Sequence, residues 1–165
     1  MKNTVRLLLG FLGGMGATVP MTAAMSGMHR RLPAGSRYPL PPREITEKIF
    51  PIRDDESGTL LTLGAHFGYG GAMGLLYAAF TKRPDEQWAA RGILAGTIVW
   101  AMSYFVLLPL AGILRPAHKH PPERNLLMVI VHFVWGLTLA GFLASMKGSS
   151  GGMVKGAPLP NRDRS

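Results

Sequence analysis

Cysteine is absent from this chain of 165 residues, which excludes disulfide bonds, cysteine nucleophiles and thiolate-bound clusters. Charged residues are absent from four long stretches, residues 7–28, 60–80, 92–114 and 126–146. A soluble domain mixes polar and apolar residues along each helix, because one face of the helix meets water. The separation of apolar from charged residues in this chain therefore excludes a soluble globular enzyme and a disordered chain.

The four charge-free stretches hold 22, 21, 23 and 21 residues, and each can cross the ~30 Å hydrocarbon core of a bilayer as a helix. The first stretch exceeds the ~7–15-residue apolar core of a cleaved signal peptide, so we expect it to be retained. The sequence thus predicts an all-α membrane protein in which residues 1–146 form a four-helix transmembrane bundle. Residues 147–165 have too little apolar surface to fold alone and are predicted to be a disordered basic tail.

The net charge of +9 fits a membrane protein, because Lys and Arg flank spanning helices and meet anionic headgroups. No basic face with interleaved aromatic residues is present, so the lipid bilayer is the expected partner and nucleic acid is not. An even number of spans places both termini on one side. Lys and Arg are divided equally between the two sides, nine on each, so the orientation stays open.

The segment between the first two stretches contains a short amphipathic pattern that runs from Arg43 to Phe50 after two prolines. Isoleucines spaced at i, i+4 and i+7 mark one face of this pattern. The other face carries charge at Arg43, Glu44, Glu47 and Lys48. The pattern predicts a short helix lying on the membrane surface, and docking of a membrane-protein partner is the alternative.

The second and fourth stretches share a pattern, with His66-Phe-Gly-Tyr-Gly70 in one and His132-Phe-Val-Trp-Gly136 in the other. Both predicted helices enter the membrane from the same side. The match therefore predicts a parallel duplication of a two-helix unit.

Small residues recur at a spacing of four within the stretches, and in lipid such residues let helix backbones approach closely. The predicted packing positions are Gly10, Gly14, Gly70, Gly74, Gly92, Gly96, Gly136 and Ala140. These positions serve either contacts within one bundle or contacts between the protomers of a homo-oligomer.

The order of several landmarks resembles the YagU-type inner-membrane proteins of bacteria. The landmarks are Leu40-Pro-Pro-Arg43, Gly92-Ile-Leu-Ala-Gly96, Leu108-Pro-Leu-Ala-Gly112 and a histidine in both the second and the fourth stretch. The resemblance implies a small multi-pass protein of the bacterial inner membrane with unknown biochemical function. It supplies no catalytic residue.

His66 and His132, with Tyr69, form a candidate intramembrane polar site, because polar groups at membrane depth are costly and often functional. Each histidine is the seventh residue of its stretch, so the two rings are expected to lie level with each other. Three interpretations stay open: a neutral ring bonded to a neighbouring helix, a proton-linked or ligand-gating role, and ligation of a b-type haem.

No catalytic motif appears, so we expect a non-enzymatic protein that is a structural or regulatory component or a small oligomeric transport element. The alternative is a redox subunit that binds b-type haem between His66 and His132. Apart from haem no cofactor is expected. No metal site is expected either, since His118 and His120 lie in a solvated loop without a third ligand nearby.

Overall fold

The computed structural model describes residues 3–33, 37, 39–50, 54–81 and 86–152, and every regular element among them is helical. The elements are α1 (Asn3–Arg30), α2 (Pro41–Ile49), α3 (Asp55–Phe80), α4 (Trp88–Ala101), the π-helical turn η2 (Met102–Leu107), α5 (Leu108–Leu110), the 3-10 turn η3 (Ala117–Lys119) and α6 (Pro122–Gly152). The predicted all-helical class and the short helix between the first two stretches are therefore confirmed.

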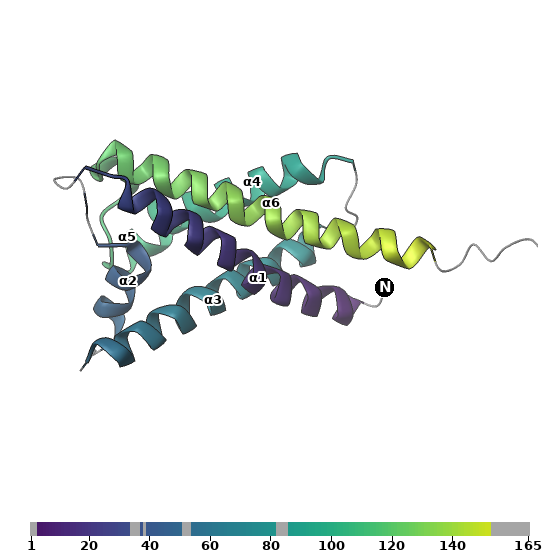
Figure 1. Ribbon diagram of the computed structural model, residues 1–165, viewed down its shortest axis with the longest axis horizontal. Helices are drawn as coiled ribbons and strands as arrows, with labels where there is room; N and C mark the ends of the chain where they lie inside the picture. Colours follow the sequence, from purple (N-terminus) through teal and green to yellow (C-terminus); the bar gives the residue numbers. More distant parts are fainter. Residues whose placement is uncertain (1–2, 34–36, 38, 51–53, 82–85, 153–165) are drawn as a thin grey trace, which may run out of the picture.

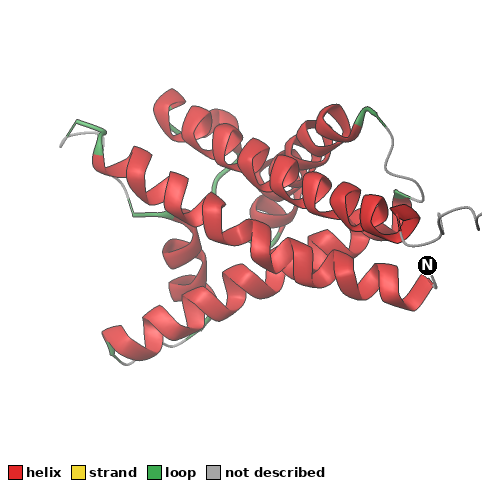
Figure 2. Ribbon diagram, turned by 45° about the vertical axis from the view of Figure 1, so that its right-hand side comes forward, coloured by secondary structure: helices red, strands yellow, loops and turns green. Residues whose placement is uncertain are grey.

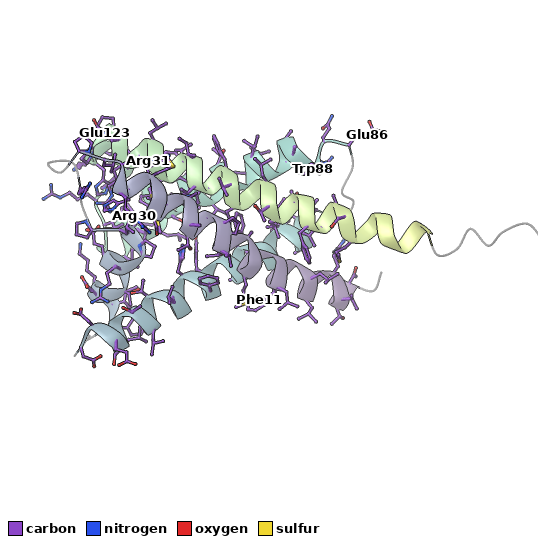
Figure 3. The ribbon with its side chains drawn as sticks, in the orientation of Figure 1. Phe11, Arg30, Arg31, Glu86, Trp88 and Glu123 are labelled. Carbon is purple, nitrogen blue, oxygen red and sulfur yellow. The ribbon has the colours of Figure 1, made fainter. Side chains whose placement is uncertain are left out.

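Three helical segments are long and apolar enough to cross a membrane, namely Asn3–Arg30, Trp88–Leu110 and Pro122–Met146. Helix α3 has 26 residues, but glycines, a histidine and two tyrosines interrupt its aliphatic residues and it does not belong to that group. Helices suited to crossing a membrane thus stand at three of the four predicted stretches. Labelled charged residues lie at the two ends of the molecule, with Arg30, Arg31 and Glu123 at one end and Glu86 at the other (Figure 3).

Two predicted boundaries differ from the structure. The third apolar helix ends at Leu110 instead of residue 114, because Gly112 turns the chain with a φ of 68° and its amide donates to the carbonyl of Pro109. Helix α6 continues to Gly152, so residues 147–152 of the segment predicted as a tail are helical. The remainder of that predicted tail, residues 153–165, lies outside the described residues.

The long helices alternate in direction along the molecule (Figure 1). Helices α1 and α4 run toward the end that carries α2, and α3 and α6 run back from it. The start of α1 and the end of α6 consequently share the opposite end of the molecule. At the α2 end, α1 and α3 diverge, and α2 lies between them (Figure 2).

The long helices form a row in the order α3, α1, α6, α4, in which α1 packs on α3, α6 packs on α4, and α1 also packs on α6. The α1·α3 and α4·α6 contacts depend on small residues. A Cβ added to Gly10 would meet the Gly74 carbonyl and Ala78, and a Cβ on Gly92 would meet the Gly136 carbonyl and Ala140. The two helix pairs, α1·α3 and α4·α6, therefore repeat one kind of contact.

When the two helix pairs are compared through their contacts, α3 and α6 correspond in a register that is one helical turn away from the sequence match of His66 with His132. Gly74 of α3 faces Gly10 in the way that Gly136 of α6 faces Gly92. On the same register Gly14 faces Gly70, whereas Gly96 faces the carbonyl of His132. His132 is thus the spatial counterpart of Gly70 and not of His66, because the closest backbone approach fixes the register of the pairs.

Helix α6 supplies more of the described core than any other helix, with Leu127, Val131 and Leu139 among the most deeply buried side chains. Trp135 of α6 is 2% exposed, and its indole N–H donates to the Gly14 carbonyl of α1 at 3.1 Å. This buried hydrogen bond joins the two helix pairs at the centre of the row.

Candidate functional site

A cavity of about 310 Å³ lies between the helix pairs and beneath α2. Its lining comes from α1 (Thr18, Met21, Met25), α2 (Pro41, Pro42, Ile45, Thr46, Ile49), α3 (Ala65, His66, Tyr69, Gly70, Met73), the α4–α5 segment (Val99, Ser103, Tyr104, Leu107, Leu108) and α6 (Met128, His132, Trp135). Within the described part of the chain, no Asp, Glu, Lys or Arg lines it. The cavity is therefore an apolar site in which a few neutral polar groups converge.

His132 is 7% exposed, and its Nδ1 lies 2.6 Å from the carbonyl oxygen of Met128 one turn earlier. A carbonyl only accepts hydrogen bonds, so Nδ1 carries the proton and donates it. In the neutral ring Nε2 is then the unprotonated acceptor. The edge of the ring meets Tyr104, with ring centroids 6.4 Å apart, which fixes the orientation of the imidazole at the cavity wall.

His66 reaches the same cavity from α3. Its Nε2 is buried and has no hydrogen-bond partner among the residues that the structure describes. Leaving a buried polar atom without a hydrogen-bond partner costs about 1–3 kcal/mol of stability. A group that enters the cavity and forms a hydrogen bond with Nε2 of His66 would recover this free energy. The two histidines named from the sequence thus line one cavity, from α3 and from α6.

Tyr69, the third residue of the predicted polar site, joins α3 to η2. Its hydroxyl lies 2.7 Å from Oγ of Ser103. Ser103 in turn lies 2.6 Å from the carbonyl of Val99 and donates to it, so Tyr69 is the donor to Ser103. This chain of hydrogen bonds links the two outer helices of the row beside the cavity.

Helix α2 closes the end of the cavity. Thr46 is 1% exposed, and Ile45 and Ile49 line the cavity, although the sequence places these isoleucines against lipid. The charged face that the sequence predicts is partly exposed, and it makes polar contacts both within α2 and with neighbouring segments. Its contacts are Glu44 with Arg124 at 2.6 Å, Lys48 with Glu44 at 4.0 Å and with the Ile113 carbonyl at 2.5 Å, and Arg43 with Glu47 and, at 3.2 Å, with Asp55.

Two features of the site were missed by sequence reasoning. The first is the role of α2 as a cover, which the amphipathic pattern allows but does not distinguish from a membrane-surface helix. The second is the π-helical turn η2, whose amide at Leu108 donates to the carbonyl of Ser103, five residues earlier. Such turns are frequent at functional sites. The only signal for it in the sequence is Pro109 just beyond, which cannot donate to an α-helical ladder.

The loop histidines lie apart from the cavity. His118 stacks on Phe105 with centroids 6.4 Å apart, and Nε2 of His120 lies 2.9 Å from the Arg115 carbonyl. Burial, and then the charge of Arg124, lowers the pKa of His120 below its usual value. Among the described residues, no group of three or more His, Asp and Glu side chains is placed to hold a metal ion.

Comparisons with known protein families, with curated proteins and with solved structures found no match to this chain. The resemblance to YagU-type proteins stays a prediction, and the function is argued from the site itself.

Proposed function

We propose that this chain is a four-span, multi-pass protein of the bacterial inner membrane that binds a small apolar ligand in the cavity beneath α2. The observation that carries the proposal is the pair of imidazoles, His66 and His132, which face one apolar space without a charged lining residue in the described chain. Such a cavity suits a neutral, lipid-soluble molecule, because charged groups are costly to move from water into it.

The four-span topology is supported by the direction of the helices. Helices α1 and α4 both run toward the α2 end, so α3 has to return the chain across the same thickness (Figure 1). Part of what makes α3 less apolar is covered, since its glycines 70, 71 and 74 are buried against α1. A helix whose polar and small residues face protein can cross lipid with a moderate mean hydropathy.

A non-enzymatic role fits this site better than catalysis. The cavity offers two imidazoles and the hydroxyls of Thr18, Thr46, Tyr69, Ser103 and Tyr104, with no carboxylate or lysine in its described lining. Ligand binding in such a site serves a regulatory component or a small transport element, as the sequence suggests. A homo-oligomer or a membrane-protein partner stays a prediction; a Cβ added to Gly64 or Gly68 of α3 would meet nothing within 4 Å, which leaves room for a neighbouring helix.

The proposal is tested by filling the cavity. Val99→Phe places a ring in the lining, whereas Ile98→Phe adds the same ring at the next residue, which is 52% exposed and does not line the cavity. The probe is a decylbenzene carrying one ring fluorine, followed by fluorine NMR with the protein in nanodiscs. We expect a saturable bound signal in the wild type and in Ile98→Phe that Val99→Phe abolishes. An equal signal in both variants, or none in the wild type, contradicts the proposal.

Haem between the two histidines is the less favoured alternative. A volume of about 310 Å³ lies at the lower end of the range for small-molecule pockets, about 300–1,000 Å³, which suits a single ring better than a macrocycle. A visible spectrum of the purified protein decides between the two. A Soret band that is lost in both His66→Ala and His132→Ala would favour haem over a colourless ligand.

A further inference from the structure

We infer that the ligand of the cavity is a lipid-soluble para-quinol, a flat ring with a hydroxyl group at each end and an apolar tail. This inference rests on the proposed ligand-binding function and names the class of ligand. The ring occupies the space between His66 and His132, one hydroxyl faces each imidazole, and the tail extends into the bilayer.

The absence of charge in the described lining selects a neutral head. A fatty acid or an amine would bring a charge into an apolar space with no counter-charge to meet it. The ion pairs that the structure records among the described residues all involve the α2 cover, and none of the paired residues lines the cavity. A quinol is uncharged at neutral pH and carries its polarity in two hydroxyl groups.

The two imidazoles select a head with two hydrogen-bonding ends. Nδ1 of His132 donates to Met128, so its Nε2 needs a donor, and a phenolic O–H supplies one. The buried Nε2 of His66 has no partner in the described residues, and a hydroxyl satisfies it in either tautomer, because a hydroxyl both donates and accepts. The rings enter the same cavity from two different helices, α3 and α6, so a head with two separate hydroxyls, as in a para-quinol, can offer one to each imidazole.

The apolar lining selects a flat ring. Tyr104 and Trp135, which are 4% and 2% exposed, present aromatic surface from two helices. Thioether side chains complete the walls, and sulfur next to an aromatic ring is a favourable and adaptable contact. These side chains are Met21, Met25, Met73 and Met128.

The lining also provides a path for the tail. Tyr69 and Leu107 line the cavity and are nevertheless 38% and 49% exposed, so the wall between α3 and the α4–α5 segment reaches the outer surface. In a four-span bundle this surface faces lipid. A ligand dissolved in the bilayer can therefore place its head in the cavity and leave its tail between hydrocarbon chains.

The test uses a decyl-substituted para-quinol, its dimethyl ether and the fluorinated decylbenzene, all with the full-length protein in nanodiscs. The quinol and its ether compete against the fluorinated probe, and the ether keeps the shape but has no hydroxyl donor. We expect the quinol to bind about tenfold more tightly than the ether, which is roughly the contribution of one hydrogen bond. In the double variant His66→Leu/His132→Leu this preference should disappear while the decylbenzene still binds, and His118→Leu, outside the cavity, should change neither.

NMR of ¹⁵N-labelled histidine gives a second readout that needs no variant. The quinol should shift the Nε2 resonance of His132 upon binding, and the dimethyl ether should leave it in place. If the ether competes as well as the quinol and the resonance does not move, the quinol assignment is wrong although the decylbenzene binds. If decylbenzene, ether and quinol all fail to bind, the ligand-binding function is wrong as well.

Discussion

The two helix pairs of this protein make the same backbone contact and surround it differently. In α1·α3 the contact is made by glycines on both helices, and α3 keeps one face toward the cavity. In α4·α6 the contact includes the backbone of His132 where the first pair has Gly70, and α6 is enclosed by both α1 and α4. Backbone geometry can thus be repeated while the side chain at a single contact position gives one pair a ring that reaches the shared cavity.

The connections within the pairs differ as well. The segment between α1 and α3 is long enough to contain α2, and α2 covers the cavity. The segment between α5 and α6 forms only the short turn η3, which Asn125 holds by donating from Nδ2 to the Ala117 carbonyl at 2.7 Å. The connection within the first pair therefore contributes the helix that covers the cavity, whereas the connection within the second pair is a short turn held by Asn125.

The largest effect is expected from breaking the shared contact. Gly74→Leu and Gly136→Leu should each lower stability by about 1–3 kcal/mol or more, because a side chain at either position meets the backbone of the facing helix. Thermal unfolding in detergent measures the loss. Gly64→Leu is the control, since a Cβ added there has nothing within 4 Å. Similar melting temperatures for all three variants would show that the paired contacts do not hold the molecule together.

A smaller and more local effect is expected at the α2 cover. Glu44→Gln removes the charge opposite Arg124, which is 5% exposed, and a nearly buried charge without its counter-ion is costly. We expect α2 to detach more often, so that a cysteine placed at the buried Thr46 reacts faster with a thiol reagent. The chain has no other cysteine, which makes the measurement clean. Glu47→Gln is the control, because Glu47 pairs with Arg43 inside α2. Equal rates for the two charge variants would assign the Glu44–Arg124 pair no part in closure.

Lowering the pH should destabilise the loop of residues 115–121, which contains His120, before it affects the rest of the α2 end. The pKa of His120 is lowered from 6.5 by burial and then by Arg124, so the folded protein binds fewer protons than the unfolded one. The stability contributed by neutral His120 is present above about pH 6.5 and is lost as the pH falls below it. The protection factors of the amides in residues 115–121, which compare the observed exchange with the intrinsic rate at each pH, should fall on going from about pH 7.5 to 5.5. His120→Gln should remove most of this fall; an unchanged pH profile in the variant would assign it to another group.

The smallest effect is expected at the start of α3. Oδ1 of Asp54 accepts from the Ser57 amide at 2.7 Å, and this hydrogen bond lowers the pKa of Asp54 below 3.8. The cap is therefore intact above pH 3.8 and is lost as the pH falls through the lower, folded pKa. Asp54→Ala should speed amide exchange in the first turn of α3 at neutral pH, whereas Asp54→Asn should retain the cap. Equal exchange in both variants would mean that the side chain does not hold this helix end.

The helices could be predicted from the sequence because charge-free stretches leave little choice of structure, and α2 could be predicted from its amphipathic spacing. The pairing of His66 and His132 across one cavity followed from their equal depth in two parallel stretches. The register of the repeat could not be predicted. In the sequence the two stretches are matched through His66 and His132, whereas in the structure the close contacts between glycine backbones determine which residues correspond. Orientation, oligomeric state and inner-membrane localisation stay predictions, since they depend on groups outside the folded chain.

The π-helical turn η2 has a consequence for the angular phase of the segment that contains it. An α-helix advances about 100° per residue. One extra residue in a wider π-helical turn therefore rotates the side chains after the turn about the helix axis relative to those before it. On one side of the turn Gly92 and Gly96 face α6, and on the other side Leu107 and Leu108 face the cavity. Deleting a single residue between Met102 and Leu107 would give a regular α-helix and a broken site, because the two surfaces would no longer point at their partners together. The turn acts as a phase correction between the part of the helix that assembles the protein and the part that meets the ligand.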